Sequence, residues 1–597
     1  MEANKNKPQQ EAAYAVAVVD DDATTVSNKA TKHLSDDDDA GEPEENYRGW
    51  KAMPYVIGNE TCEKLGTIGT TANLLVYLTT VYGMKSASAT TLLSMWGGTV
   101  NMAPVLGAFL SDSYLGRYAT IALASMASFA GMILLTLTAA VPSLHPASHG
   151  GGGGPSATHM AVLLVSLGLL SVGAGGIRPC NLAFGADQFD PRTPSGRKGI
   201  NSFFNWYYFT FTIAMMVSAT VIIYLQSNVS WALGLAVPAT LMGLSCALFF
   251  MGTRLYVRVR PEGSPLTSFA QVLVAAYRKR RLPKPSPEQL FDPPHKSSLI
   301  TKIAYTDQFL CLDKAAVVVS PQDANPWRLC TLQQVEEVKC LARLLPVWSS
   351  GIVYYIVLTN LGNYNVLQAM QTDRHIGRSG FQIPAGSFVV FNMLALTVWI
   401  PVYDSLVVPA LQRVTRREGG ISQLQRIGTG IVMSIVTMLL AAAVERHRRK
   451  VGDATSCFVL VPQQMLAGLS EAFAVIGQVD FYYKQFPENM RSVAGALLFL
   501  GFAIASYASG LMVTVVHRTT GGRNGQPDWL TQDLNQGRVD LYYLLIAAMA
   551  AVNLVYFVFC ARWYRFKESD DAAAVAVVEM EEKDGRLSKH VSTAPPV

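Results

Sequence analysis

The sequence predicts an all-α membrane protein with twelve transmembrane helices in two groups of six. Half of the 597 residues are hydrophobic and only 15% are charged, whereas a soluble protein of this length carries about 25% charge. The mean hydropathy is +0.24, and the charge is concentrated at the two ends and in the middle of the chain. This pattern is typical of membrane spans separated by hydrated loops.

Each predicted span is long enough to cross the hydrocarbon core, which is ~30 Å thick and needs about 20 apolar residues. Backbone groups in lipid must form their hydrogen bonds internally, so each stretch is expected to be a helix. The twelve stretches lie at 53–80, 90–111, 118–142, 158–180, 204–226, 230–253, 337–360, 384–411, 427–444, 457–482, 492–516 and 539–563.

Polar segments divide these spans into two six-helix bundles, at 51–253 and 336–566. The basic, proline-rich segment 254–335 is expected to link them, and it ends in a capping box formed by Thr331 and the glutamine three residues later. The acidic segment 1–50 and the segment 567–597 are expected to be disordered tails, because neither can bury enough apolar surface to fold. Docking of the first tail on a basic partner is the alternative.

The distribution of Lys and Arg near the span ends predicts that both termini and the linker are cytosolic. One loop disagrees, because Arg446, Arg448, Arg449 and Lys450 fall on the opposite side. The net charge of +5 is small for this length, so a nucleic-acid partner is not expected, and the eight scattered cysteines have no metal-binding spacing. No metal or cofactor is therefore expected.

The sequence has no motif that would drive transport by ATP or support hydrolysis. It contains no Gly-Lys-Ser/Thr phosphate loop, no His-Glu-x-x-His and no Gly-x-Ser-x-Gly. An enzyme is therefore not expected. A secondary transporter needs only a small-molecule site and a coupling-ion site between its spans.

Ionisable residues inside apolar spans are the candidate functional residues, because burying them in a bilayer is costly. Glu60, Glu63 and Lys64, here called the first-span trio, lie on one face of a helix. Desolvation raises the pKa of a carboxyl group and a nearby cation lowers it, so a rearrangement of the trio could load and release a proton. A static buried ion pair is the alternative.

Two further ionisable residues lie within later spans. Arg178 follows the small residues of 173–176 and could supply a second cation to the trio, or it could extend to the membrane interface. Glu471 lies midway along the tenth span, where a substrate-binding or gating role competes with a structural one.

Asp112 and Arg117 flank the turn between the second and third spans and are interpreted as a structural latch.

Several long motifs resemble the plant nitrate and peptide transporter family, the proton-dependent oligopeptide transporters of the major facilitator fold. The resemblance runs from about residue 46 to residue 567 and rests on 60–64, 106–118, 173–190 (GAGGIRPCNLAFGADQFD) and 202–209 (SFFNWYYF). A narrower likeness to a branch of nitrate-excretion and glucosinolate carriers lies in 325–339, 380–388, 419–428 and 481–492.

The resemblance implies roles for individual residues. The first-span trio matches the proton-coupling motif, with lysine where the family more often has arginine, while Arg178 and Glu471 match a basic position of the fourth span and a glutamate of the tenth. Ser113 matches a hydroxyl position that is phosphorylated in one nitrate carrier. Residues 65–68 (LGTI) replace the Phe-x-Tyr-Tyr of peptide carriers, and Leu358 stands where one relative binds nitrate through a histidine.

Together these observations predict a major facilitator protein that carries protons and a small solute across a plant membrane, with the plasma membrane favoured over the vacuolar one. The leading hypothesis is symport of nitrate or a related small anion. A larger metabolite such as a glycoside or glucosinolate is the first alternative, with Tyr354 and Tyr355 as candidate aromatic contacts. A membrane sensor that binds solute without useful flux is the second. The oligomeric state is left open.

Overall fold

The computed structural model describes residues 47–146, 155–190, 193–258, 265–283, 285, 289–293, 303, 305–319, 325–376, 381–415, 420–485, 491–521 and 528–564. Apart from residues 47–50, the predicted tails lie outside these ranges. The described residues form helices and contain isolated β-bridges but no strand.

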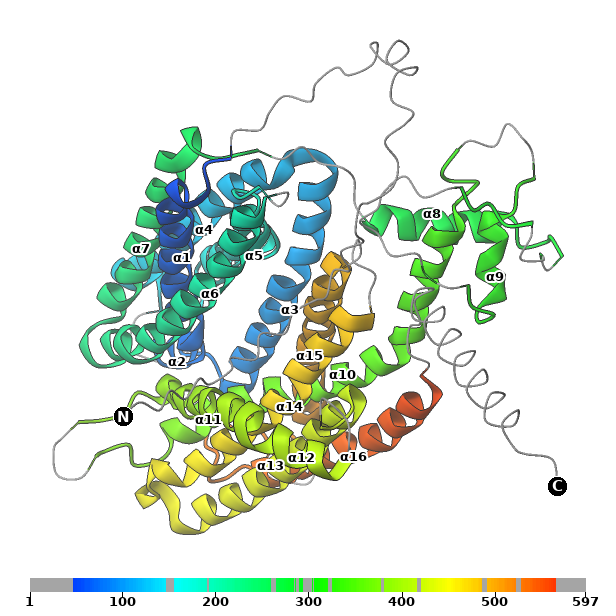
Figure 1. Cartoon of the computed structure of the whole chain (residues 1–597). Coiled ribbons are helices and arrows are strands. Elements are labelled where there is room, and N and C mark those ends of the chain that lie inside the picture. The colour runs from blue at the N-terminus through cyan, green and yellow to red at the C-terminus, as the bar shows by residue number, and fades with distance from the viewer. Residues whose placement is uncertain are drawn as a thin grey trace, which may run out of the picture. The chain divides into compact units, whose positions relative to one another are not determined.

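The helices follow one another along the chain as Figure 1 shows. Their bounds are α1 (Met53–Ala72), α2 (Leu74–Thr80), α3 (Ser86–Leu110), α4 (Gly116–Ala140), α5 (Ala157–Ala186), α6 (Pro194–Val217), α7 (Trp231–Met251), α8 (Pro265–Arg278), α9 (Leu310–Asp313), α10 (Leu332–Met370), α11 (Val389–Val402), α12 (Val408–Thr415), α13 (Gln423–Val451), α14 (Val461–Gln485), α15 (Arg491–Thr520) and α16 (Val539–Trp563).

The predicted membrane spans coincide with these helices. Within the described ranges, nine helical segments are long and apolar enough to cross a bilayer, and one of them, Ser86–Ala140, contains the second and third predicted spans. The first and fifth predicted spans are helical but fall outside this set. The helical membrane character is therefore confirmed, while the count of twelve spans stays a prediction.

Helices α1 and α3 to α7 pack mainly on one another, and α10 to α16 form a second group of neighbours. The main contact between the two groups joins α3 to α15, which lie side by side in Figure 1. In this contact the hydroxyl of Thr99 lies 2.9 Å from that of Tyr507. The two halves of the chain thus meet along helix faces that carry hydroxyl groups.

Small residues bring α3 and α5 into backbone contact. A Cβ atom on Gly107 would lie only 1.9 Å from the carbonyl oxygen of Gly175, so no larger residue fits at this crossing. Close approach of this kind maximises van der Waals contact where lipid supplies no hydrophobic driving force between helices. It also fixes the position of the α5 segment that carries Arg178.

The linker is ordered around the first turns of α10. The capping box predicted there is confirmed, since the Thr331 hydroxyl accepts from the Gln334 amide and the Gln334 side chain accepts in return. The ammonium group of Lys339, which is fully buried, lies 2.6 Å from Asp313 of α9 and 2.7 Å from Glu336. This ion-pair cluster joins the linker to the same helix that contributes Leu358 further along.

Candidate functional site

The first-span trio is assembled in α1 as the sequence predicts. The Lys64 ammonium lies 2.9 Å from Glu63 Oε2 and 3.4 Å from Glu60 Oε1. The exposed fractions of Glu60 and Glu63 are 1% and 3%, so both carboxylates are withdrawn from solvent and share one cation. With all three groups ionised, the trio carries one excess negative charge.

Neutral donors hold the two carboxylates in place. Thr67, one helical turn after Glu63, donates its hydroxyl to Glu63 Oε1 at 2.7 Å. The amide nitrogen of Asn181 in α5 donates to Glu60. Hydrogen bonds to an ionised carboxylate stabilise that form, so these two contacts favour the charged state of each carboxylate.

Arg178, which the sequence offers as a second cation for the trio, lies near Glu63 without an ion pair to it. Its guanidinium and Glu63 line the same narrow cavity, together with Thr71. Within the described part of the chain no carboxylate lies within 4.0 Å of Arg178, and its side chain donates instead to the neutral Asn101 Oδ1 at 3.2 Å. Arg178 is therefore a partly buried cation whose charge is not neutralised by direct contact.

A second cavity of about 230 Å³ adjoins the first at Thr71, which lines both. Residues of α1, α2 and α3 form one wall, and residues of α10, α11 and α14 form the other. The lining includes Leu358, the four amides Asn363, Asn365, Asn392 and Gln464, and the carboxylate of Glu471, with no Lys, Arg or His. The space lies between the two halves of the chain, where a transported solute must bind.

The predicted substrate residues separate into two sets. Leu358 and Glu471 line the larger cavity, and Asn392 donates to Glu471 Oε1 at 2.8 Å. Tyr354 and Tyr355 are each 1% exposed and line neither cavity. The Tyr354 hydroxyl lies 3.0 Å from that of Ser470, and Tyr355 donates to Gln478. Both tyrosines thus pack between helices, one turn from the cavity wall.

The structure gives Arg117 a partner other than the one the sequence suggests. Its guanidinium lies 2.5 Å from Asp187, just beyond the end of α5, and no ion pair with Asp112 is found among the described residues. Asp112 and Ser113 lie in a π-helical turn, Ser111–Leu115, and the Ser113 hydroxyl oxygen is buried without a hydrogen bond. The turn therefore joins α4 to α5 through Arg117, and phosphorylation of Ser113 stays a prediction.

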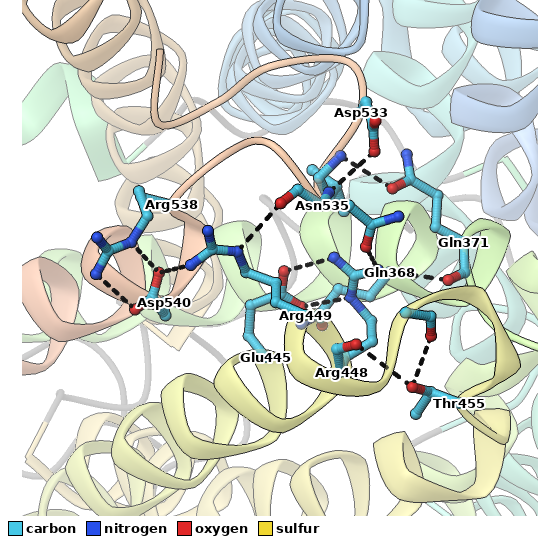
Figure 2. A network of polar contacts seen from close by, with 12 residues as sticks. Gln368, Gln371, Glu445, Arg448, Arg449, Thr455, Asp533, Asn535, Arg538 and Asp540 are labelled. Carbon is cyan, nitrogen blue, oxygen red and sulfur yellow. Dashed lines mark hydrogen bonds and ion pairs between the residues drawn. The ribbon is translucent and has the colours of Figure 1, made fainter. Parts of the chain in front are cut away.

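A polar network that sequence reasoning missed lies at the other end of the second helix group, as Figure 2 shows. Arg448 and Glu445, both fully buried, form a two-pronged ion pair with distances of 2.8 Å. Arg449 lies 3.3 Å from Asp540, which also accepts from Arg538. Two of the basic residues at 446–450, Arg448 and Arg449, are thus paired with acidic side chains of the protein.

Neither cavity has the composition of a metal or cofactor site. Among the described residues no group of three or more His, Cys, Asp or Glu side chains is placed to hold a metal ion. All eight cysteines have free thiols.

Buried ionisable groups, two cavities that share Thr71 and walls supplied by both halves of the chain are typical of a membrane transporter. The chain belongs to the POT family: the family model PTR2, described as the POT family, matches residues 118–530. The family is one of transporters, a non-enzymatic class, which agrees with the sequence analysis.

Relatives of known sequence support the same membership. The Arabidopsis thaliana Protein NRT1/PTR FAMILY 2.11 is 50% identical, with 88% of this chain and 90% of the relative aligned. Protein NRT1/PTR FAMILY 2.9 of the same plant is 47% identical, with 90% and 96% aligned. Both names place the relatives in the predicted family, while the narrower branch stays a prediction.

Solved structures agree on the fold. A crystal structure of an auto-inhibited POT family peptide transporter has a TM-score of 0.63 at 20% identity, covering 86% of this chain and 98% of that one. The POT family transporter PepTSo has a TM-score of 0.65 at 18% identity with the same coverage. At these identities the likeness establishes the fold alone, and it confirms the predicted fold class.

Proposed function

We propose that the chain is a proton-coupled symporter of nitrate or a related small anion, acting in a plant plasma membrane with both termini in the cytosol. The observation that best supports this proposal is that Arg178 shares a narrow cavity with Glu63. Among the described residues, no carboxylate contacts the guanidinium of Arg178. An arginine fork in a water-poor cavity is suited to a planar, weakly hydrated anion.

Charge balance links the proton to the anion. The trio carries one net negative charge and Arg178 one positive charge, so the four groups are neutral when all are ionised. Protonation of one carboxylate leaves one excess positive charge, and a bound monoanion restores neutrality. Because an unbalanced charge is costly in a bilayer, proton and anion stabilise each other's binding, as linkage requires.

Two variants of Arg178 test the anion. We expect Arg178→Lys to retain some nitrate uptake, because the charge remains, and Arg178→Ala to lose most of it. Arg254→Ala, at an exposed position after α7, is the matched control and should transport normally. Uptake in oocytes at acidic and neutral external pH is the measurement, with surface expression quantified for each variant. Normal pH-dependent nitrate uptake by Arg178→Ala contradicts the proposal.

A second candidate function has its own supporting observation. The larger cavity presents four amides and no basic side chain. Such a wall suits a neutral or extended solute rich in hydroxyl groups, such as a glycoside. This interpretation replaces the anion interpretation if excess nitrate leaves the uptake of a transported glycoside unchanged and no nitrate-dependent current appears at acidic pH.

A further inference from the structure

The network of Figure 2 includes Gln368, which further hydrogen bonds connect to the wall of the larger cavity. Asn365 is 2% exposed and lines that cavity. Its Oδ1 accepts from Gln463 at 3.0 Å, and the same Gln463 nitrogen donates to Gln368 Oε1 at 3.0 Å. Gln368 in turn donates to Glu445 Oε2 at 2.7 Å. Three amides therefore connect the buried ion pair to the cavity.

The ion pair dictates which way each amide is turned. A carboxylate paired with arginine has no proton to donate, so Gln368 must present its nitrogen to Glu445 and its oxygen to Gln463. The hydroxyl of Tyr543 also donates to that oxygen, at 3.1 Å. Gln463 must then present its nitrogen, even though its own Oε1 is buried without a hydrogen bond.

The same reasoning fixes the orientation of Asn365, the last amide in the chain Gln368–Gln463–Asn365, here called the relay. The Asn365 oxygen is engaged by Gln463, which leaves its nitrogen as the remaining polar atom, and no partner for that nitrogen is found within the described ranges. An amide nitrogen can only donate. The buried ion pair thus sets a hydrogen-bond donor at the cavity wall.

We propose that Asn365 is a specificity-determining residue whose amide N–H donates to an oxygen atom of the bound solute. Glu445 and Arg448 are positioning residues, which act through Gln368 and Gln463. The inference deepens the proposed function and rests on transport through this cavity. The solute class is one with an accessible oxygen acceptor, which both nitrate and a glycoside offer.

Thermal unfolding tests the direction of the relay without any transport. Asn365→Asp and Gln463→Glu each add one carboxylate at neighbouring buried positions, 2% and 0% exposed. With the proposed direction, the carboxylate at 365 still accepts from Gln463, whereas the one at 463 faces two amide oxygens. Purified Gln463→Glu should therefore melt at a lower temperature than Asn365→Asp at alkaline pH. The reverse order overturns the relay.

Transport kinetics test the donor. Loss of one hydrogen bond to a solute oxygen should raise the KM of Asn365→Ala about tenfold, with little change in maximal rate. Tyr543→Phe, which removes a contact but leaves the polarity of Gln368 intact, should stay within about twofold. Labelled nitrate and a glucosinolate are the probes, and the solute whose KM rises is the one that Asn365 contacts.

The outcomes separate the two proposals. A KM within twofold of wild type for every transported probe overturns the role of Asn365. If the wild-type protein carries neither probe, the proposed function fails, and the donor role of Asn365 falls with it. The order of melting temperatures then still decides the direction of the relay.

Discussion

Replacement of Lys339 by methionine should release the linker from α10. The lysine is fully buried and is shared by Asp313 at 2.6 Å, Glu336 at 2.7 Å and the backbone oxygen of Thr306 at 2.7 Å. The two carboxylates are 1% and 0% exposed, and without the cation they would face each other in a dry environment. Breaking a buried pair from one side costs about 3–5 kcal/mol.

Such a cost is large enough to measure as local opening. At about 1.4 kcal/mol per factor of ten, the lower bound of ~3 kcal/mol raises the undocked population roughly a hundredfold. Hydrogen–deuterium exchange of the peptide 305–319 should accelerate by about that factor, because exchange reports opening free energy. Lys314→Met is the matched control, since this half-buried lysine donates to the backbone oxygen of Arg280, at 2.8 Å, and has no ion pair among the described residues.

The triple variant Lys339→Met, Asp313→Asn, Glu336→Gln separates lost charge from lost packing. The triple variant leaves no uncompensated buried charge, which is the main cost of removing one partner of a buried ion pair, so exchange should return toward the wild-type rate. Exchange in Lys339→Met that is less than threefold faster than in wild type would refute the reasoning. The same conclusion follows if Lys314→Met has an equal effect.

Further predictions concern coupling, packing and topology. Glu63→Gln should reach the membrane but lose proton-driven accumulation and the rise of uptake at low external pH; an unaltered pH profile would remove the coupling mechanism. Gly107→Ala should lower the melting temperature, since its Cβ would meet the backbone of α5 at 1.9 Å, whereas Gly168→Ala, with nothing within 4 Å, should not. Tags at Lys5 and Pro596 should be inaccessible from outside intact cells, and surface labelling would contradict the cytosolic assignment.

The elements predictable from sequence are those set by local or strongly periodic signals. The first-span trio could be read from spacing alone, because a helix places residues three and four apart on one face. The capping box at Thr331 is likewise local, since its members stand three residues apart. Apolar length identified most helices, but it could not show that α1 ends at Ala72 and α2 begins at Leu74, where Asn73 interrupts the helix.

The unpredicted parts depend on contacts between distant segments. Arg117 has one acid nearby in sequence, yet it pairs with Asp187, seventy residues away. The pairing of Arg449 with Asp540 spans ninety-one residues. The amides of the cavity, such as Asn365, had a usable signal, because polar side chains within apolar spans usually form hydrogen bonds between helices or line a cavity. Their orientation, however, follows from a chain of neighbours that no spacing rule contains.

Helix α10 is longer than the membrane core requires. Its 39 residues extend about 58 Å at 1.5 Å per residue, nearly twice a bilayer core. Pro346 lies inside it and removes the hydrogen bond to the carbonyl of Ala342, which weakens the helix there. Pro346 therefore divides α10 into two parts. Lys339 ties the first part to the linker, while the second lines the larger cavity and joins the network of Figure 2 through Gln368.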